Sequence, residues 1–198
     1  MEIDTGKLFR ISVPVLEGFS RIEPRKWGLD GILLELATEI GSLGRNLTIW
    51  EGYRYGRKSR HKMADELSDI FFVLVRLCLE LGITPKARLA GTAAESPDGM
   101  FSRLLDLYSE LKGDVKGGTH NRLATTARIE GMMMLVCMLA EHYGISLEEA
   151  HKEEMDLTFH WQRLFFNSEG RKRCSITLLP RKLLWGVIAL LHQRRMDR

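Results

Sequence analysis

The fold is decided by residues 62–75, Lys62-Met63-Ala64-Asp65-Glu66-Leu67-Ser68-Asp69-Ile70-Phe71-Phe72-Val73-Leu74-Val75. Apolar residues recur here at spacings of three and four, which is typical of a helix. After Asp69 the segment is so apolar that the helix must be buried on most sides. The pattern predicts a long helix from about Ser59 to Leu81, with Gly82 closing it.

A second helix is predicted upstream, over residues 30–43. Asp30 is placed to cap its N-terminus. Gly41 and Gly44 weaken helix formation towards its end. Its apolar stripe consists of Ile32, Leu33, Leu36 and Ile40.

Acidic side chains mark both predicted helices. Glu66 and Asp69 lie three residues apart, so they share one helix face at the edge of the buried seam. Glu35 and Glu39 lie on the upstream helix. If Glu39 faces the other pair, the carboxylates repel one another unless a hard cation such as Mg²⁺ lies between them. Without such a match, Glu66 and Asp69 would be an ordinary solvated helix face.

The second half of the chain resembles the first. Residues 104–110 match residues 33–39 at an offset of 71, and residues 132–145 match residues 70–83 at an offset of 62. One helical hairpin cannot cover so apolar a helix by itself, so two hairpins are expected to bury these helices against each other.

The connections that follow the two long helices also match. Thr84 and Ser146 occupy equivalent positions, and each is placed to cap a following helix. After Ser146, an amphipathic helix is expected over residues 147–166.

The predicted fold is an all-α helical bundle of two tandem helical-hairpin repeats with additional C-terminal helices. We assign residues 1–89 to the first repeat, 90–98 to a linker, 99–166 to the second repeat and 167–198 to a basic turn and helix. The last helix would cover the bundle or form a subunit contact, and a homodimer is expected.

Composition limits the function classes. The chain has 198 residues, 44% of them hydrophobic, and a net charge of +3, which is too mild to indicate nucleic acid. Basic clusters lie at residues 54–62 and 171–182, but aromatic interleaving is sparse near the C-terminus, which argues against nucleic-acid binding. No apolar stretch is long enough to span a membrane, and the three scattered cysteines fit a reducing, cytoplasmic location.

Three short segments together carry a family resemblance. They are Glu39-Ile40-Gly41-Ser42, Trp50-Glu51-Gly52, and Lys62 to Asp69 with its apolar continuation. This arrangement resembles the MazG-like, all-α nucleoside triphosphate pyrophosphohydrolases, whose pattern is Glu-x-x-Glu on one helix and Glu-x-x-Asp on the next. The resemblance covers residues 27–84, with a weaker echo to about residue 166.

The resemblance implies a substrate, a cofactor and roles for individual residues. Glu39, Glu66 and Asp69 would bind Mg²⁺, or Mn²⁺ in its place, and Lys62 would lie near the phosphates. The family cleaves a nucleotide between its α and β phosphates, releasing a monophosphate and pyrophosphate. Basic and aromatic residues beside the acidic helix are candidate substrate contacts, namely Arg54 and Trp50, although Trp50 could equally be a packing residue.

Two departures from the family pattern leave an alternative open. Ser42 stands where the family has its second glutamate, and Glu35, one turn before Glu39, is our candidate for the missing carboxylate and for a general base. In the second repeat, Arg128 and Gly131 replace the acidic pair, so Arg128 would neutralise Glu110 or Asp106, or would reach substrate phosphates. The alternative function is a catalytically degenerate protein that binds nucleotides or mediates assembly.

Overall fold

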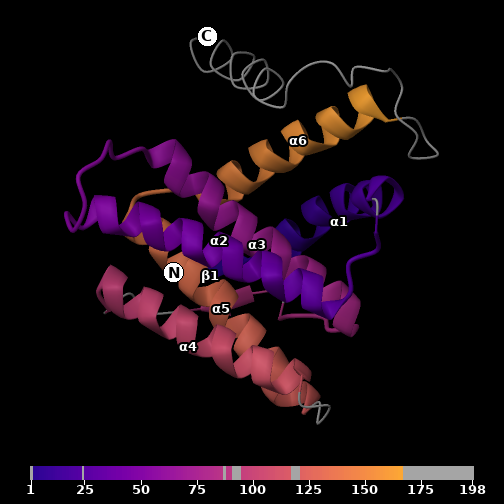
Figure 1. Cartoon of the computed structure of the whole chain (residues 1–198), viewed down its shortest axis with the longest axis horizontal. Coiled ribbons are helices and arrows are strands. Elements are labelled where there is room, and N and C mark those ends of the chain that lie inside the picture. The colour runs from indigo at the N-terminus through magenta and orange to yellow at the C-terminus, as the bar shows by residue number, and fades with distance from the viewer. Residues whose placement is uncertain (1, 24, 87, 91–94, 117–120, 167–198) are drawn as a thin grey trace.

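The structure is a computed structural model that describes residues 2–23, 25–86, 88–90, 95–116 and 121–166. Over these residues the chain forms the expected helical bundle (Figure 1). The described residues also include one short two-stranded ribbon. The predicted C-terminal turn and helix, residues 167–198, lie outside the described residues. The elements are β1 (Glu2–Asp4), α1 (Thr5–Ile22), α2 (Leu29–Trp50), α3 (Arg60–Leu81), β2 (Arg88–Ala90), α4 (Pro97–Lys116), α5 (Arg122–His142) and α6 (Leu147–Phe165).

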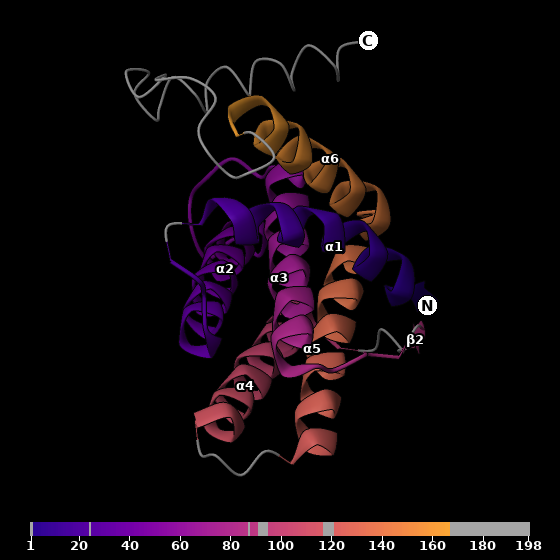
Figure 2. The same ribbon diagram turned by 90° about the vertical axis from the view of Figure 1, so that its right-hand side faces the viewer.

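Helix α3 is the centre of the bundle, and α1, α2, α5 and α6 all pack against it (Figure 2). Its predicted ends are confirmed. The Ser59 hydroxyl accepts a hydrogen bond from the Lys62 backbone N–H over 3.2 Å, and Gly82 closes the helix at φ +62°. Most side chains from Leu67 to Cys78 are buried, which explains why the helix is apolar on most of its sides there.

Helix α2 is longer than predicted at its C-terminus. Its N-cap is Gly28 and not Asp30, which lies in the first turn. The helix continues through Gly41 and Gly44 to Trp50 because its buried stripe continues to Leu47. A Cβ atom at Gly44 would lie 2.6 Å from the Phe101 ring of α4, so this glycine permits close packing of the two helices.

The second hairpin, formed by α4 and α5, has caps that match those of the first at the predicted offset of 62. Asn121 caps α5 as Ser59 caps α3, each accepting from a backbone N–H three residues on. At the other end, Gly144 has φ +64°, and the Ile145 N–H donates to the Ala140 carbonyl as the Ile83 N–H donates to that of Cys78. Descent of the two hairpins from one repeat stays a prediction.

Helix α1 was not predicted, and it packs with α6 across the end of the bundle. His151 of α6 is fully buried between two hydroxyl groups. Its Nε2 lies 2.7 Å from the Ser12 Oγ of α1, and its Nδ1 lies 3.0 Å from the Ser68 Oγ of α3. These contacts tie three helices together through one imidazole.

The strand ribbon replaces a helix that was expected after Thr84. Strands β1 and β2 pair antiparallel, with Ile3 opposite Leu89, so the segment after α3 is extended and the prediction that Thr84 caps a helix is wrong. Ser146, its predicted counterpart, does cap α6 through the Glu149 N–H.

Helix α5 is the one described helix whose length and composition would suit a membrane span. In the structure, 61% of its apolar window is buried inside the protein, as expected for a core helix. Cys78 and Cys137 are buried free thiols.

Candidate functional site

The predicted acidic residues come from facing helices. Glu39 projects from α2, and Glu66 and Asp69 lie one turn apart on α3, which packs along α2. Glu66 is only 9% exposed, and Glu39 and Asp69 are partly buried. The structure therefore brings the three predicted metal ligands to one side of the α2–α3 hairpin.

Glu66 is held by two hydrogen-bond donors from α2. The Asn46 amide Nδ2 donates to the Glu66 Oε1 over 3.1 Å, and the Ser42 hydroxyl also donates to this carboxylate. Burial raises the pKa of Glu66 from its ordinary value, while the charge of Lys62 and these two hydrogen bonds oppose that rise. Ser42, which stands where the resemblance led us to expect a second glutamate, thus contacts the acidic cluster as a donor.

The pKa values of Glu39 and Asp69 are strongly raised by burial and by neighbouring carboxylates. Burial, followed by the charges of Glu35 and Glu66, raises the pKa of Glu39 to about 7. Burial also raises the pKa of Asp69 to about 8, with further contributions from Glu154, Glu39, Asp65 and Glu66. Neighbouring carboxylates thus make the ionisation of Glu39 and of Asp69 less favourable, as is common at functional sites.

Two residues of this cluster were missed by sequence reasoning. Asn46 lies one turn beyond Ser42, past the predicted end of the helix. Glu154 lies on α6, and its charge is the largest electrostatic cause of the rise in the pKa of Asp69. No sequence motif connects Glu154 to the acidic helix. Its place in the cluster follows only from the packing of α6 on α3.

The donor set fits a hard divalent cation in its chemistry, because all the side chains offer carboxylate, hydroxyl or amide oxygens. Among the described residues, however, no three Asp, Glu, His or Cys side chains are arranged so that they could hold a metal ion as they stand. The oxygen atoms of the cluster therefore do not converge on a single metal position in this conformation.

The predicted substrate-binding residues lie at the end of the hairpin nearest Lys62. Lys62 and Arg54 are exposed. Trp50 packs its ring 5.2 Å from that of Tyr143 on the α5 C-cap, and the Lys58 Nζ lies 5.8 Å from the Trp50 ring centre. Trp50 is thus a packing residue on at least one of its faces. Glu35, the candidate base, lies partly buried on α2 beside Glu39, whose pKa its charge raises.

A guanidinium group neutralises acidic residues in the second hairpin. The Arg128 Nε lies 2.8 Å from the Glu110 Oε2, and its Nη1 bonds to Asp114. The predicted pairing with Glu110 is present, and the second partner in the structure is Asp114, one turn on from Glu110. Arg128 occupies the position that matches Glu66, so a fixed cation stands here in place of a carboxylate.

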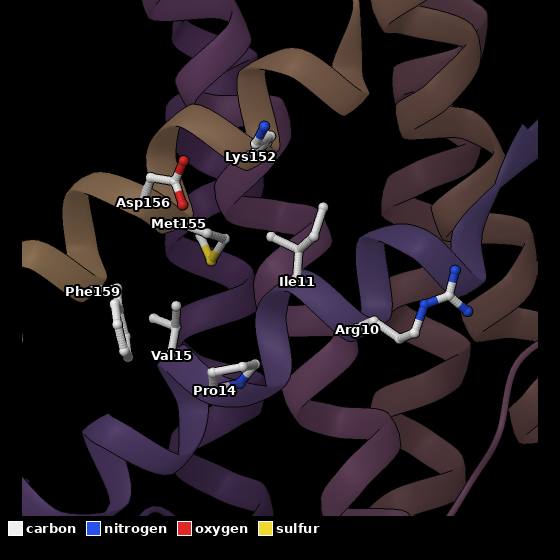
Figure 3. Close-up of a pocket in the computed structure, with 8 residues that line it drawn as sticks. All are labelled: Arg10, Ile11, Pro14, Val15, Lys152, Met155, Asp156 and Phe159. Carbon is white, nitrogen blue, oxygen red and sulfur yellow. The ribbon is translucent and has the colours of Figure 1, made fainter.

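A shallow cavity of about 330 Å³ lies elsewhere, between α1 and α6 (Figure 3). Its lining is mostly apolar, with Ile11, Val15, Met155 and Phe159 among the residues. None of the predicted site residues borders it, so it is separate from the acidic cluster.

Comparisons with protein families, with curated proteins and with solved structures give no match to this chain.

Proposed function

We propose that this protein is a Mg²⁺-dependent nucleotide pyrophosphohydrolase that cleaves a nucleoside triphosphate or a related nucleotide between its α and β phosphates. The observation that supports this most directly is the acidic cluster of α2 and α3. Three carboxylates that are buried or partly buried and have raised pKa values, Glu39, Glu66 and Asp69, lie together, and the charge of Lys62 acts on Glu66. A purely structural role gives no reason to gather such groups.

In this proposal each residue has a distinct task. Glu39, Glu66 and Asp69 hold Mg²⁺, or Mn²⁺ in its place, and Asn46 fixes the orientation of Glu66. The bound ion would polarise the phosphoryl group and lower the pKa of a coordinated water. Lys62, one turn before Glu66, neutralises phosphate oxygens. Glu35 accepts a proton from the attacking water.

The second candidate is a catalytically degenerate protein of the same fold that binds nucleotides or mediates assembly. Ser42 favours it, because its hydroxyl satisfies the Glu66 carboxylate from the position where the family places a ligand. Under this alternative the nucleotide still binds, but no phosphoanhydride bond is broken. We place either form in the cytoplasm, and a homodimer stays a prediction.

Pyrophosphate release tests the proposal. The full chain is incubated with Mg²⁺ and a panel of canonical and damaged nucleoside triphosphates, beside the variant Glu66→Gln. We expect release from at least one nucleotide, and a loss of about 100-fold or more in the variant because a proposed metal ligand is removed. Glu80→Gln is the matched control, since Glu80 is exposed near the end of the same helix and should leave the rate unchanged.

Two results would count against the enzyme. Release that persists in Glu66→Gln would place the chemistry elsewhere. Calorimetric binding of Mg²⁺ and a nucleotide, with no pyrophosphate from any member of the panel, would favour the degenerate alternative.

A further inference from the structure

The connection between α2 and α3, residues 51–59, projects from one end of the bundle (Figure 1). Its outer part is highly exposed. Tyr53 is 70% exposed and Tyr55 is fully exposed, although aromatic side chains of this size are usually at least partly covered. Arg54, Arg57 and Lys58 are exposed beside them. We refer to residues 53–60 as the basic loop.

The basic loop is held firmly to the protein. The Arg54 backbone N–H donates to the Thr48 carbonyl over 2.9 Å, and the Tyr53 hydroxyl lies 2.7 Å from the Asp98 Oδ2. Gly56 lies so close to Ile49 that a Cβ atom there would be 2.8 Å from its Cδ1. The exposure of the loop is therefore a property of a fixed conformation, and its ordering costs little on binding.

The cations of the basic loop differ from other arginines of the chain. Arg76 is paired with Glu23, and Arg103 with Glu95. In contrast, Arg54, Arg57 and Arg60 form no ion pair with another described residue. The N-terminus of α3, which begins at Arg60, adds the positive end of its helix dipole to this surface. An anionic ligand would relieve the mutual repulsion of these groups.

Exposed tyrosines between unpaired cations match the chemistry of a nucleic-acid strand. Proteins that bind single strands combine basic groups, which contact the phosphates, with aromatic rings on which bases stack. A membrane surface fits less well, because apolar insertion needs Leu, Phe or Trp side chains, and Trp50 beside the loop is packed on Tyr143. A duplex would not offer its base faces to Tyr55.

We propose that the basic loop binds single-stranded nucleic acid, with Arg57, Lys58 and Arg60 along the phosphates and Tyr55 stacked on a base. The expectation from the sequence, which argued against nucleic acid, rested on the mild net charge of +3 and on the sparse aromatic residues near the C-terminus. This inference uses a different surface and does not depend on the proposed hydrolase activity. It leaves Lys62 and Arg54 to the substrate of the acidic site.

Fluorescence anisotropy of the full chain with a labelled single-stranded 12-mer, as RNA and as DNA, tests this proposal over a range of NaCl concentrations. Three phosphate contacts give a slope of log K against log salt of about −2. The double variant Arg57→Gln/Arg60→Gln should reduce the magnitude of that slope by about 1.4. Tyr55→Ala should weaken binding by about 5- to 150-fold through the lost stacking.

The controls separate charge, position and the acidic site. Arg25→Gln/Lys26→Gln removes two exposed cations from the connection between α1 and α2 and should leave the slope within about 0.3 of the parent's. Glu66→Gln should bind the strand like the parent while losing pyrophosphate release. The thermal unfolding midpoints of the basic-loop variants should equal that of the parent, since these side chains are exposed.

Several outcomes would overturn the proposal. One is an unchanged slope and affinity in both basic-loop variants. Another is displacement of the 12-mer by a nucleoside triphosphate at equal phosphate concentration, which would assign the loop to the substrate. A third outcome concerns phosphatidylserine vesicles. If the same variants lose more affinity for the vesicles than for the strand, the basic loop would be identified as a membrane-binding surface.

Discussion

The side-chain amide of Asn46 on α2 donates a hydrogen bond over 3.1 Å to the carboxylate of Glu66 on α3. Both residues are buried, so this bond joins the two helices at the candidate site and fixes one carboxylate in place. A buried carboxylate that loses such a donor is left with an unmet requirement for hydrogen bonding.

Asn46→Ala should therefore destabilise the protein by about 1–3 kcal/mol, the cost of removing a hydrogen bond to a buried charged group. Urea denaturation followed by circular dichroism measures the change. Thr38→Ala is the control on the same helix, because Thr38 is exposed, and it should shift the free energy of unfolding by less than about 0.5 kcal/mol. Equal effects of the two substitutions would show that the bond to Glu66 contributes nothing.

Asp69→Asn should not lower the thermal midpoint of the metal-free protein, because it removes a carboxylate that repels Glu154 and Glu39. Mg²⁺ at ten times its dissociation constant should raise the midpoint of the parent by about 3–5 °C and leave that of the variant unchanged. Differential scanning fluorimetry with EDTA or Mg²⁺ tests both points, with Glu80→Gln as control. A variant that unfolds earlier in EDTA would mark Asp69 as a structural residue.

His151 should make the protein sensitive to acid. Burial lowers the pKa of His151 to about 4, below its ordinary value of 6.5. Between these values the unfolded chain binds more protons than the folded one, so the stabilising contribution is complete above about pH 6.5 and is lost as the pH falls to about 4. The loss is of the order of 3 kcal/mol.

Unfolding free energies of the parent and of His151→Gln, measured from pH 7 to pH 4, test this prediction. The difference between the two proteins should shrink as the pH falls, because only the parent has an imidazole to protonate at this position. The exposed His160 gives the matched control, and His160→Gln should follow the parent throughout. A difference that stays constant with pH would contradict the prediction.

Two glycines of α2 should respond in opposite directions to alanine. Gly41→Ala should stabilise the protein by about 0.5–1 kcal/mol through helix propensity, since nothing lies within 4 Å of the new Cβ. Gly44→Ala should destabilise it by about 1–3 kcal/mol, because its Cβ would lie 2.6 Å from the Phe101 ring. Urea denaturation of both variants decides the question, and stabilisation by both would mean that Phe101 moves aside freely.

Features that depend on the sequence of one helix alone were predicted correctly. The spacing of Glu66 and Asp69, the cap at Ser59 and the stop at Gly82 are local features, and the structure has each of them. Local rules were wrong at Gly44, where low helix propensity suggested an end but close packing with Phe101 favours continuation. Asn46 lies beyond the predicted end of the helix, so it was not predicted as a residue of the site.

Other parts depend on contacts between distant segments. Glu154 reaches the acidic cluster only because α6 packs on α3, and no spacing rule connects residues 69 and 154. Helix α1 was missed because Pro14 lies inside it, where proline is unfavourable, and because its buried face includes the polar residues Thr5 and Ser12. Ser12 becomes acceptable in the core only once His151 is beside it.

The Arg128 guanidinium between Glu110 and Asp114 gives the two hairpins different requirements. Its positive charge is encoded in the chain, so chelators cannot remove it and cells need not supply it. The Glu110 and Asp114 carboxylates of the α4–α5 hairpin therefore have a countercharge within the chain. The α2–α3 hairpin gathers carboxylates with raised pKa values, so under the proposed function we predict that its rigidity responds to the ions around it.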